Sequence, residues 1–330
     1  MSLQTRFTRK FQIEHPIVLA PMDYASDATL AGAVSAAGGL GLVGGGYGDR
    51  QWLHDQFDAV QDGTVGCGFI TWALGQQPEL LDETLQYGPR AIFLSFGDPT
   101  PYAESIREAG VPLICQISDL EQAKQAIGAG ADVLVAQGGE AGGHGLGTRS
   151  TFTLVPDVAD LIARSSPETL LLAAGGVADG RGLAAALTLG ADGVVVGTRF
   201  WATPEAAIPS TAHERALQAT GDDTIRSSVY DIVREKDWPR EFTGRVLHND
   251  FVKRWHGQET QLTAALASAK TGFVQAVAQQ DYDEANMIVG ESVGMVRRIV
   301  PAAEVVELMA SEAEALLDGR YAGWVSSEPS

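Results

Sequence analysis

The sequence predicts an α/β protein of the (β/α)8 TIM-barrel class, because eight short apolar runs alternate with helix-compatible stretches between residue 16 and about residue 200. Each run is uninterrupted and largely uncharged, as expected for a parallel strand that is buried on both faces. A count of eight favours a closed barrel over an open doubly wound sheet. The runs cover residues 17–20, 40–43, 66–70, 91–95, 111–117, 131–136, 169–174 and 192–197.

The stretches between these runs have the endings of helices. Three of them span residues 26–38, 119–130 and 180–190, and each ends on glycine, the usual residue just past a helix C-terminus. They therefore supply the helical half of the predicted βα repeat.

The repeat breaks near Pro204, and the strand signal vanishes from about 205 to 285. This stretch is polar, charged and helix-compatible, so we predict a small, mostly helical insertion after the eighth strand, on the substrate side of the barrel. A glycine-rich loop follows, and then an amphipathic closing helix over 301–317. The predicted parts are a barrel of residues 1–204 and 286–330, and a subdomain of residues 205–285.

The composition excludes several classes of protein. Lys and Arg number 23 against 42 Asp and Glu, giving a net charge of −19, which argues against a protein that binds nucleic-acid phosphates. No run approaches the roughly 18 apolar residues of a membrane span, and the N-terminus lacks the apolar core of a secretory signal. Cys67 and Cys115 lie in apolar runs and are expected to be buried, reduced thiols. We therefore expect a cytoplasmic protein without membrane or nucleic-acid partners, and a homo-oligomer is compatible with this composition.

Glycine-rich loops follow the seventh and eighth predicted strands, where this fold usually binds phosphate. Glycine lets backbone N–H groups approach a ligand closely, and the next helix N-terminus adds partial positive charge. The alternative is that these glycines only form tight turns, but two such loops in the two expected places favour a phosphate site. The loops contain Gly175 and Gly176, and then Gly197, Thr198 and Arg199 directly after Val196.

The loop after the sixth strand is longer and presents a single imidazole. Residues 137–145 read QGGEAGGHG, so that backbone can lie against a flat ligand and His144 stands at the far side of the loop. An imidazole can accept a proton or donate a hydrogen bond to an anion. Although a loop histidine that caps nearby carbonyls is the alternative, the glycine frame favours function.

Other candidate positions are less specific. Pro21 and Met22 lie at the barrel mouth, where Met22 lies against a cofactor ring or merely fills a gap, and Asp23 is a candidate helix cap. Lys124 lies in a predicted helix, on a solvated face or in contact with the ligand. No His, Cys or carboxylate pattern supports a metal, no motif supports acyl transfer, and GxGxxG after the first strand is absent.

Four segments carry a recognisable pattern, namely APM at 20–22, ADVLVAQGGEAGGH at 131–144, AAGGVADGRG at 173–182 and GADGVVVGTRF at 190–200. Together they resemble the nitronate monooxygenase family of FMN-dependent TIM barrels, formerly called 2-nitropropane dioxygenases. The GGEAGGH stretch is specific, whereas the GG and GTR loops are shared with other flavin and phosphate-binding barrels. A segment at 290–304, GESVGMVRRIVPAAE, is also similar to the family's closing segment.

The resemblance implies one non-covalent FMN whose phosphate lies on Gly176, Gly197 and Thr198. It also implies that Gln137 and Gly142 contact the ring or ribityl chain, that Met22 backs the isoalloxazine and that Lys124 touches the flavin. His144 would orient or deprotonate the substrate. The predicted cofactor-binding set is Pro21, Met22, Thr71, Lys124, Gln137, Gly142, Gly143, Gly175, Gly176, Val196, Gly197, Thr198 and Arg199, with no metal ligand.

The implied reaction is the oxidation of an alkyl nitronate to a carbonyl compound and nitrite, with molecular oxygen as the second substrate. One departure concerns the third strand, where the family often has a GxN pattern; residues 66–72 read GCGFITW, and Thr71 offers a hydroxyl instead of the amide. The alternatives are an NAD(P)H-dependent flavin reductase acting on quinones or enoyl thioesters, and a phosphate-ligand-binding barrel without redox function.

Overall fold

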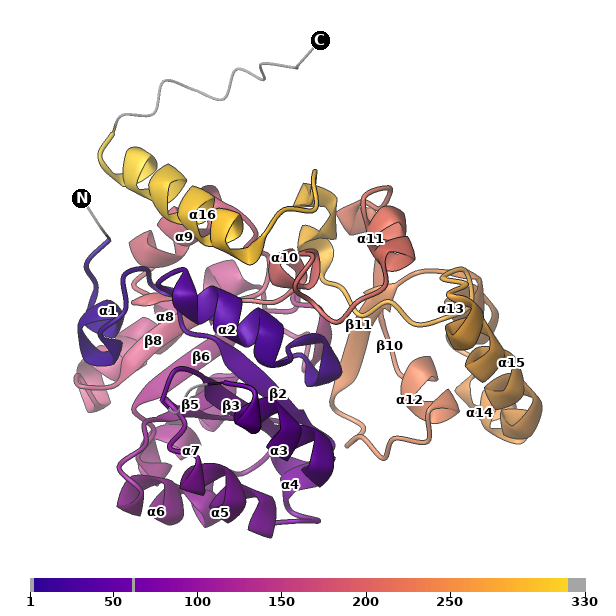
Figure 1. Cartoon of the computed structure of the whole chain (residues 1–330), viewed down its shortest axis with the longest axis horizontal. Helices are drawn as coiled ribbons and strands as arrows, with labels where there is room; N and C mark the ends of the chain where they lie inside the picture. The colour runs from indigo at the N-terminus through magenta and orange to yellow at the C-terminus, as the bar shows by residue number, and fades with distance from the viewer. Residues whose placement is uncertain (1–2, 61–62, 320–330) are drawn as a thin grey trace.

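The computed structural model describes residues 3–60 and 63–319 and contains a closed barrel of eight parallel strands (Figure 1). The strand order is β1-β9-β8-β6-β5-β4-β3-β2, and a parallel bridge between Val18 and Leu40 closes the ring. All eight predicted runs form these strands, so the predicted fold class is confirmed. The barrel strands are β1 (Ile17–Leu19), β2 (Leu42–Gly46), β3 (Gly66–Ile70), β4 (Ile92–Ser95), β5 (Leu113–Ile117), β6 (Val133–Gln137), β8 (Leu170–Ala174) and β9 (Gly193–Val196).

Helices cover the outside of the barrel, and each of the three helical stretches singled out above contains one of them, namely α2, α7 and α9. The predicted closing helix is α16 (Ala302–Leu317), which packs against α9 and α2. The helices of the barrel part are α1 (Arg6–Phe11), η1 (Asp23–Ala25), α2 (Ala28–Ala36), α3 (Arg50–Asp58), α4 (Thr71–Leu74), α5 (Glu79–Gln86), α6 (Thr100–Glu108), α7 (Leu120–Ala129), α8 (Thr151–Ser165), α9 (Gly180–Thr188), α10 (Thr198–Trp201) and η3 (Glu291–Met295).

One end of the barrel is closed by the first helix. Phe7 and Phe11 of α1 are buried in the cluster of apolar side chains that fills the barrel interior. Arg6 fixes this helix through two hydrogen bonds to the Asp192 carboxylate, at 2.8 and 2.9 Å. This is the amino-terminal end of the strands, so space for a ligand remains at their carboxyl end.

Residues 205–285 are mostly helical, as predicted, but they also contain two strands that the sequence did not reveal. These are β10 (Thr224–Ser227) and β11 (Thr243–Leu247), which form an antiparallel sheet with β7 (Gly143–Gly145) from the loop after β6. Both strands are short and interrupted by arginine, so they lack the apolar pattern of the barrel strands. The helices here are α11 (Ser210–Ala216), η2 (Gly221–Asp223), α12 (Val229–Val233), α13 (Asp250–Trp255), α14 (Glu259–Ala264) and α15 (Leu266–Gln279).

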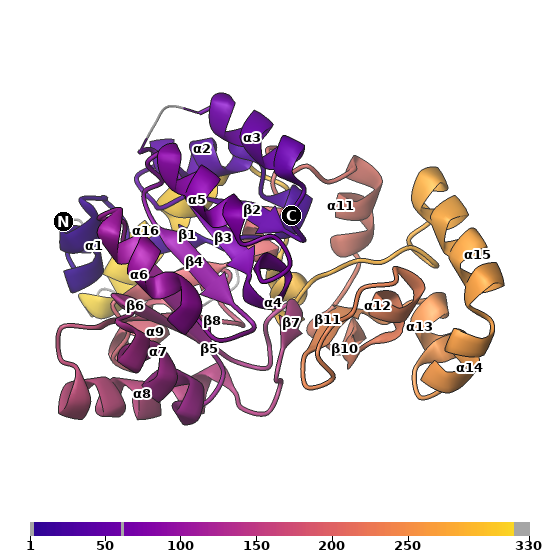
Figure 2. The same ribbon diagram turned by 90° about the horizontal axis from the view of Figure 1, so that it is seen from below.

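The inserted segment lies at the end of the barrel opposite α1, in both ribbon views (Figure 2). The β10–β11–β7 sheet stands between the barrel and helices α12–α15. The division of the chain into two parts at 204 and 286 stays a prediction, and its outermost residues 1–2 and 320–330 lie outside the described residues. No helix in the described ranges is long and apolar enough to cross a membrane.

Candidate active site

A cavity of about 370 Å³ opens at the carboxyl ends of the barrel strands. Its wall comes from the loops after the barrel strands, from the segment around Trp238 and from residues 286–288. The volume falls within the range of cofactor and ligand sites. The predicted site residues that line it are Pro21, Met22, Gln137, Gly142, Gly143, His144, Gly175, Gly176, Gly197 and Thr198.

Four predicted residues are not among the side chains that line the cavity. Lys124 lies on the outer, solvent-facing surface of α7 and forms an ion pair with Glu121 at 2.6 Å. Val196 points out of the barrel into the apolar layer beneath the helices, because side chains alternate along a strand. Arg199 turns back to the carbonyl of Ala202, at 3.0 Å, and Thr71 is buried with its hydroxyl unpartnered among the described residues.

The two glycine-rich loops leave an open cradle on the cavity wall. Gly175 and Gly176 have φ angles of +102° and +74°, which L-residues rarely adopt. A Cβ on Gly176 would meet nothing nearer than Glu140 Cβ at 3.7 Å, so it would occupy free space. A Cβ on Gly197 would likewise meet only Ala20 Cβ and the Met22 sulfur, both at 3.6 Å. Such a cradle suits a bulky anionic group such as a phosphate.

The loop after β6 is ordered by its neighbours rather than by its own sequence. Strand β7 pairs with β11 so that His144 lies opposite Gly244, and Gln137 Nε2 donates a hydrogen bond to the His144 carbonyl at 3.0 Å. A Cβ on Gly142 would come within 2.5 Å of the backbone nitrogen of Gly290, so glycine is required where these two segments touch. The loop thus packs on the segment that leads into α16.

Two arginines of the inserted segment donate hydrogen bonds to carbonyls of the same loop. Arg226 on β10 donates to the carbonyl of Gly145 at 2.6 Å, and Arg245 on β11 donates to that of Gly139 at 2.9 Å. Burial and, to a smaller extent, the charge of Arg245 lower the pKa of Arg226 to about 10. Because both side chains donate to carbonyls at the two ends of the loop, they fix where its histidine stands.

His144 is held by a carboxylate on one edge and an aromatic ring on one face. Its Nε2 lies 3.0 Å from Asp231 Oδ2, and both side chains are about nine-tenths buried, with 10% and 9% exposed. The ring stacks on Trp238 with centroids 3.4 Å apart and planes 4° from parallel. A carboxylate only accepts hydrogen bonds, so Nε2 carries the hydrogen and Nδ1 is left to accept or donate a proton. No hydrogen bond of Nδ1 to the described residues is found.

Sequence reasoning missed both of these partners. Asp231 lies on α12 and Trp238 in the loop that follows, 87 and 94 residues after His144. Neither belongs to a local motif, and only the pairing of β7 with β11 brings them to the histidine. No group of His, Cys, Asp and Glu among residues 3–60 and 63–319 is arranged to hold a metal ion.

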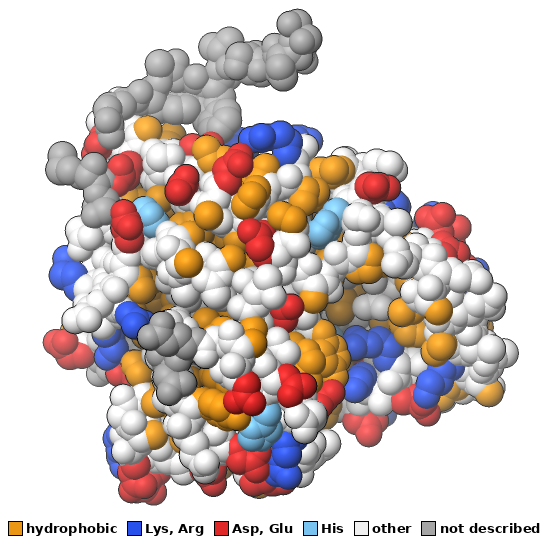
Figure 3. All heavy atoms as spheres, in the orientation of Figure 1, with side chains coloured by type: hydrophobic (Ala, Val, Ile, Leu, Met, Phe, Trp, Pro, Cys, Tyr) orange, Lys and Arg blue, Asp and Glu red, His pale blue; other side chains and the backbone are white. Residues whose placement is uncertain are grey.

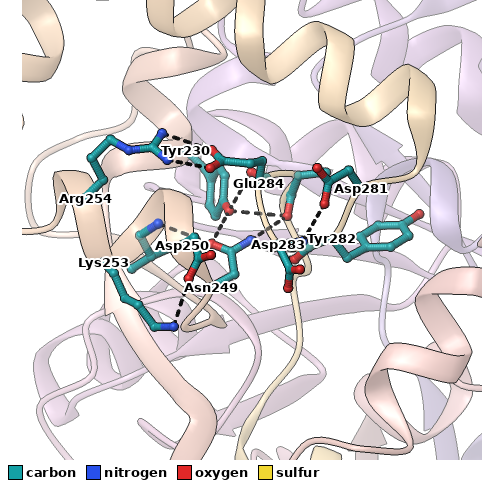
Figure 4. Close-up of polar contacts among 11 residues, drawn as sticks. Tyr230, Asn249, Asp250, Lys253, Arg254, Asp281, Tyr282, Asp283 and Glu284 are labelled. Atoms are coloured by element: carbon teal, nitrogen blue, oxygen red, sulfur yellow. Dashed lines mark hydrogen bonds and ion pairs between the residues drawn. The ribbon is translucent and has the colours of Figure 1, made fainter.

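A polar cluster around Asn249 supports the part of the cavity wall that residues 286–288 form (Figure 4). Its Nδ2 donates to the carbonyls of Tyr282 and Ala285, at 3.0 and 2.9 Å. Its Oδ1 accepts from the Tyr230 hydroxyl at 2.9 Å and from the Val252 backbone N–H at 3.2 Å, which caps α13. One buried amide therefore fixes the chain that leads to the cavity-lining residues 286–288.

Replacing Asn249 by alanine should destabilise the protein by about 2–4 kcal/mol, because it removes a helix cap and leaves the Tyr282 carbonyl without its side-chain donor. The Tyr230 hydroxyl keeps the carbonyls of Glu284 and Ala285, at 3.2 and 3.3 Å. Denaturant unfolding measures this loss. Lys253→Ala is the matched control, since Lys253 lies exposed on the same helix and its ion pair with Asp250 is open to solvent, so its loss should change stability little. Equal effects of the two substitutions would show that Asn249 has no special role.

The position of the cavity places the protein among the (β/α)8-barrel enzymes, because this end of the barrel carries the active site in that class. The family described as nitronate monooxygenase matches residues 4–69 and 70–312. The chain belongs to the nitronate monooxygenase family and is a flavin-dependent oxidoreductase of that kind. This membership excludes the alternative of a phosphate-ligand-binding barrel without redox function.

Individual relatives carry different names. A nitronate monooxygenase of Neurospora crassa is 30% identical over an alignment of 345 positions, gaps included, which spans 91% of this chain and 90% of that protein. A (3aS,4S,5R,7aS)-5-hydroxy-7a-methyl-1-oxo-octahydro-1H-indene-4-carboxyl-CoA dehydrogenase of Mycobacterium tuberculosis is 35% identical over 236 residues, covering 70% of this chain and 65% of that protein. The structure of FabK from Thermotoga maritima superposes with a TM-score of 0.81 at 29% identity, covering 96% of this chain and 98% of that one.

Proposed function

We propose that the protein binds FMN and oxidises alkyl nitronates with molecular oxygen, giving a carbonyl compound and nitrite. The observation that carries the proposal is the shared cavity: His144, paired with Asp231, lines the same space as the open cradle at Gly176 and Gly197. A side chain that handles protons and a cradle that accommodates phosphate thus lie in one cavity of cofactor size. From the composition we expect the enzyme to act in the cytoplasm, and an alkyl nitronate is a small, anionic substrate.

The residues of the cavity fit FMN. Gly176, Gly197 and Thr198 would hold the phosphate, because their backbone borders free space and no side chain fills it. Met22, Gln137 and Gly142 would contact the ring system and the ribityl chain. FMN supplies the two-electron oxidation of the substrate and the return of those electrons to oxygen.

His144 would manage the charge of the substrate. A nitronate carries its negative charge on two oxygens, so a protonated imidazole can donate a hydrogen bond to one of them from Nδ1. The same nitrogen, when neutral, can accept the α-proton of a nitroalkane. In both cases the Asp231 carboxylate holds the ring by accepting from Nε2 and stabilises its positive charge. Trp238 covers one face of the ring and excludes water from it.

An anaerobic absorbance titration of the flavin-loaded protein tests this function. We expect added ethylnitronate to bleach the flavin absorbance bands, and added NADH to leave them unchanged. Admission of oxygen should restore the bands and release nitrite. Bleaching by NADH and none by nitronate would contradict the proposal.

The second candidate is an NAD(P)H-dependent reductase, and the 35% identity to a carboxyl-CoA dehydrogenase favours it. Such an enzyme needs room for a nicotinamide beside the flavin, and the inserted segment with Trp238 borders the cavity where that ring would enter. The NADH arm of the same titration separates the two candidates, with a quinone or an enoyl thioester as the electron acceptor.

A further inference from the structure

Asp23 is a carboxylate at the cavity that the proposed function does not use. It follows Met22 at the start of η1 and lines the same cavity as His144. The sequence suggests it as a helix cap, but α2 is capped by Asp27, whose carboxylate accepts from the Leu30 backbone N–H at 3.0 Å. Within the described part of the chain, Asp23 forms no ion pair and no hydrogen bond with another side chain. Its carboxylate is therefore available to a ligand.

The backbone of Asp23 is strained, and the neighbouring strand accommodates it. Its φ is +52°, a left-handed conformation that is costly for residues other than glycine, although less so for Asp and Asn. Two glycines of β2 leave room for this residue. A Cβ on Gly44 would collide with the Asp23 carbonyl oxygen, and a Cβ on Gly46 would collide with its Oδ1. Strain that the surroundings impose in this way concentrates at functional sites.

The surroundings of the Asp23 carboxyl favour its protonated form. Burial raises its pKa, because the charged form loses hydration. Two cations of the segment after α12 and the next backbone N–H offset part of this rise, while a carboxylate at the start of α3 adds to it. In Figure 3, Lys and Arg side chains gather at the hollow between the barrel and the part that carries α12–α15. The carboxyl therefore keeps its proton to a higher pH than a surface carboxyl does. The charged and titratable groups around it are Tyr24, Tyr47, Asp49, Arg234 and Lys236.

The protonation state of a carboxyl group determines how it interacts with an anion. An ionised carboxylate only accepts hydrogen bonds, and it repels a negative group more strongly in a cavity than in water. A protonated carboxyl is neutral and donates one hydrogen bond from its O–H. An anion that enters the cavity therefore raises the affinity of the carboxyl for a proton. By thermodynamic linkage, the proton raises the affinity for the anion by the same factor.

We propose that Asp23 couples the binding of an anionic substrate to the uptake of a proton: the neutral carboxyl donates a hydrogen bond to an oxygen of the anion, and the ionised carboxylate opposes binding. The inference rests on the proposed function, in which the anion is a nitronate, and adds a residue that selects between the anionic and the neutral form of the substrate. The proton comes from solvent, and no covalent bond to the substrate forms. A neutral nitroalkane binds whether Asp23 is protonated or not.

The test measures the binding of nitrate, a planar anion with the O–N–O group of a nitronate, to the flavin-loaded protein. Calorimetry in buffers of different ionisation enthalpy gives both the affinity and the number of protons taken up. The affinity of the wild type should fall as the pH rises through the pKa of Asp23. Asp23→Asn should bind nitrate about tenfold more tightly than the wild type at alkaline pH, equally at acidic pH, and with less proton uptake between them. Loss of a proton from His144 weakens binding in both proteins, so the difference between the two profiles isolates Asp23.

Asp49→Asn is the matched control. Asp49 is exposed at the start of α3, outside the cavity wall, and asparagine caps a helix as well as aspartate does. This variant loses the same charge and should keep its nitrate affinity within about twofold of the wild type. Asparagine tolerates a positive φ, so Asp23→Asn should fold as the wild type does. Asp23→Gly, which also relieves the strained backbone, should show the same tighter binding at alkaline pH.

A kinetic arm compares the two forms of one substrate at alkaline pH. Asp23→Asn should raise kcat/KM for ethylnitronate about tenfold and leave that for freshly dissolved nitroethane within about twofold. If the wild type oxidises neither compound, the proposed function fails, and nitrate binding still decides on Asp23. Equal nitrate affinities of the wild type and Asp23→Asn at every pH, or an equal gain in Asp49→Asn, would overturn the coupling.

Discussion

Replacing His144 by alanine should lower nitronate turnover by about a hundredfold to ten-thousandfold, the range expected when a positioned proton-handling group is removed. Bound FMN should remain, because the glycine cradle at Gly176 and Gly197 lies on other loops, and the Cβ positions of these glycines do not border the imidazole. Flavin absorbance of the purified variant and nitrite release per flavin measure the two effects separately. Loss of flavin together with activity would make His144 a structural residue.

The alanine variant leaves the Asp231 carboxylate buried without its partner, which can cost several kcal/mol of stability. His144→Gln is the second variant, because its amide Nε2 stands near the position of the imidazole Nε2 and can still donate to that carboxylate. Asp231→Asn tests the pair from the other side: it keeps a hydrogen-bond acceptor for Nε2 and removes the charge. We expect it to lower kcat more than KM, and less severely than the loss of the imidazole.

Replacing Gly176 by valine should weaken FMN binding at least about tenfold, since strain and lost space together exceed the roughly 1.4 kcal/mol that a factor of ten requires. The φ of +74° disfavours a β-branched residue, and the added methyl groups would fill the space in which the phosphate is proposed to lie. Titration of the apoprotein with FMN, followed by quenching of flavin fluorescence, gives the dissociation constant.

Gly130→Val tests the effect of backbone strain without any loss of space in the cavity. Gly130 has a φ of +88° at the exposed end of α7, where a Cβ would meet nothing within 4 Å. This variant should lose stability but bind FMN as the wild type does. Normal FMN binding by Gly176→Val would remove the loop after β8 from the cofactor site.

The barrel could be predicted from the sequence because its strands are buried on both faces. Runs such as Leu170–Ala174 are apolar throughout, and outside the barrel strands no helix or strand in residues 3–60 and 63–319 has that pattern. Strands β10 and β11 could not be predicted, because they are short and arginine interrupts their apolar residues. Their arginines, Arg226 and Arg245, bind carbonyls of another loop, so charge appears where a buried strand would have none.

The residues of the candidate site likewise fall into those that could be predicted from the sequence and those that could not. Residues in loops directly after barrel strands, such as Met22 and Gly176, could be located once the strands were counted. Asp231 and Trp238 could not, since their contact with His144 depends on a strand pairing between distant segments. Lys124 illustrates the opposite case: the resemblance places it near the flavin, whereas its helix carries it to the outer surface.

The three-stranded sheet of β7, β10 and β11 has a consequence for how activity arises during folding. The imidazole is carried by the barrel sequence but oriented by residues synthesised much later, so the barrel strands can assemble before His144 has its partners Asp231 and Trp238. Local opening of the inserted segment would likewise release the histidine from Asp231 without disturbing the glycine cradle. Under the proposed function, the probability that this segment is folded therefore limits the fraction of FMN-loaded molecules that can turn over substrate.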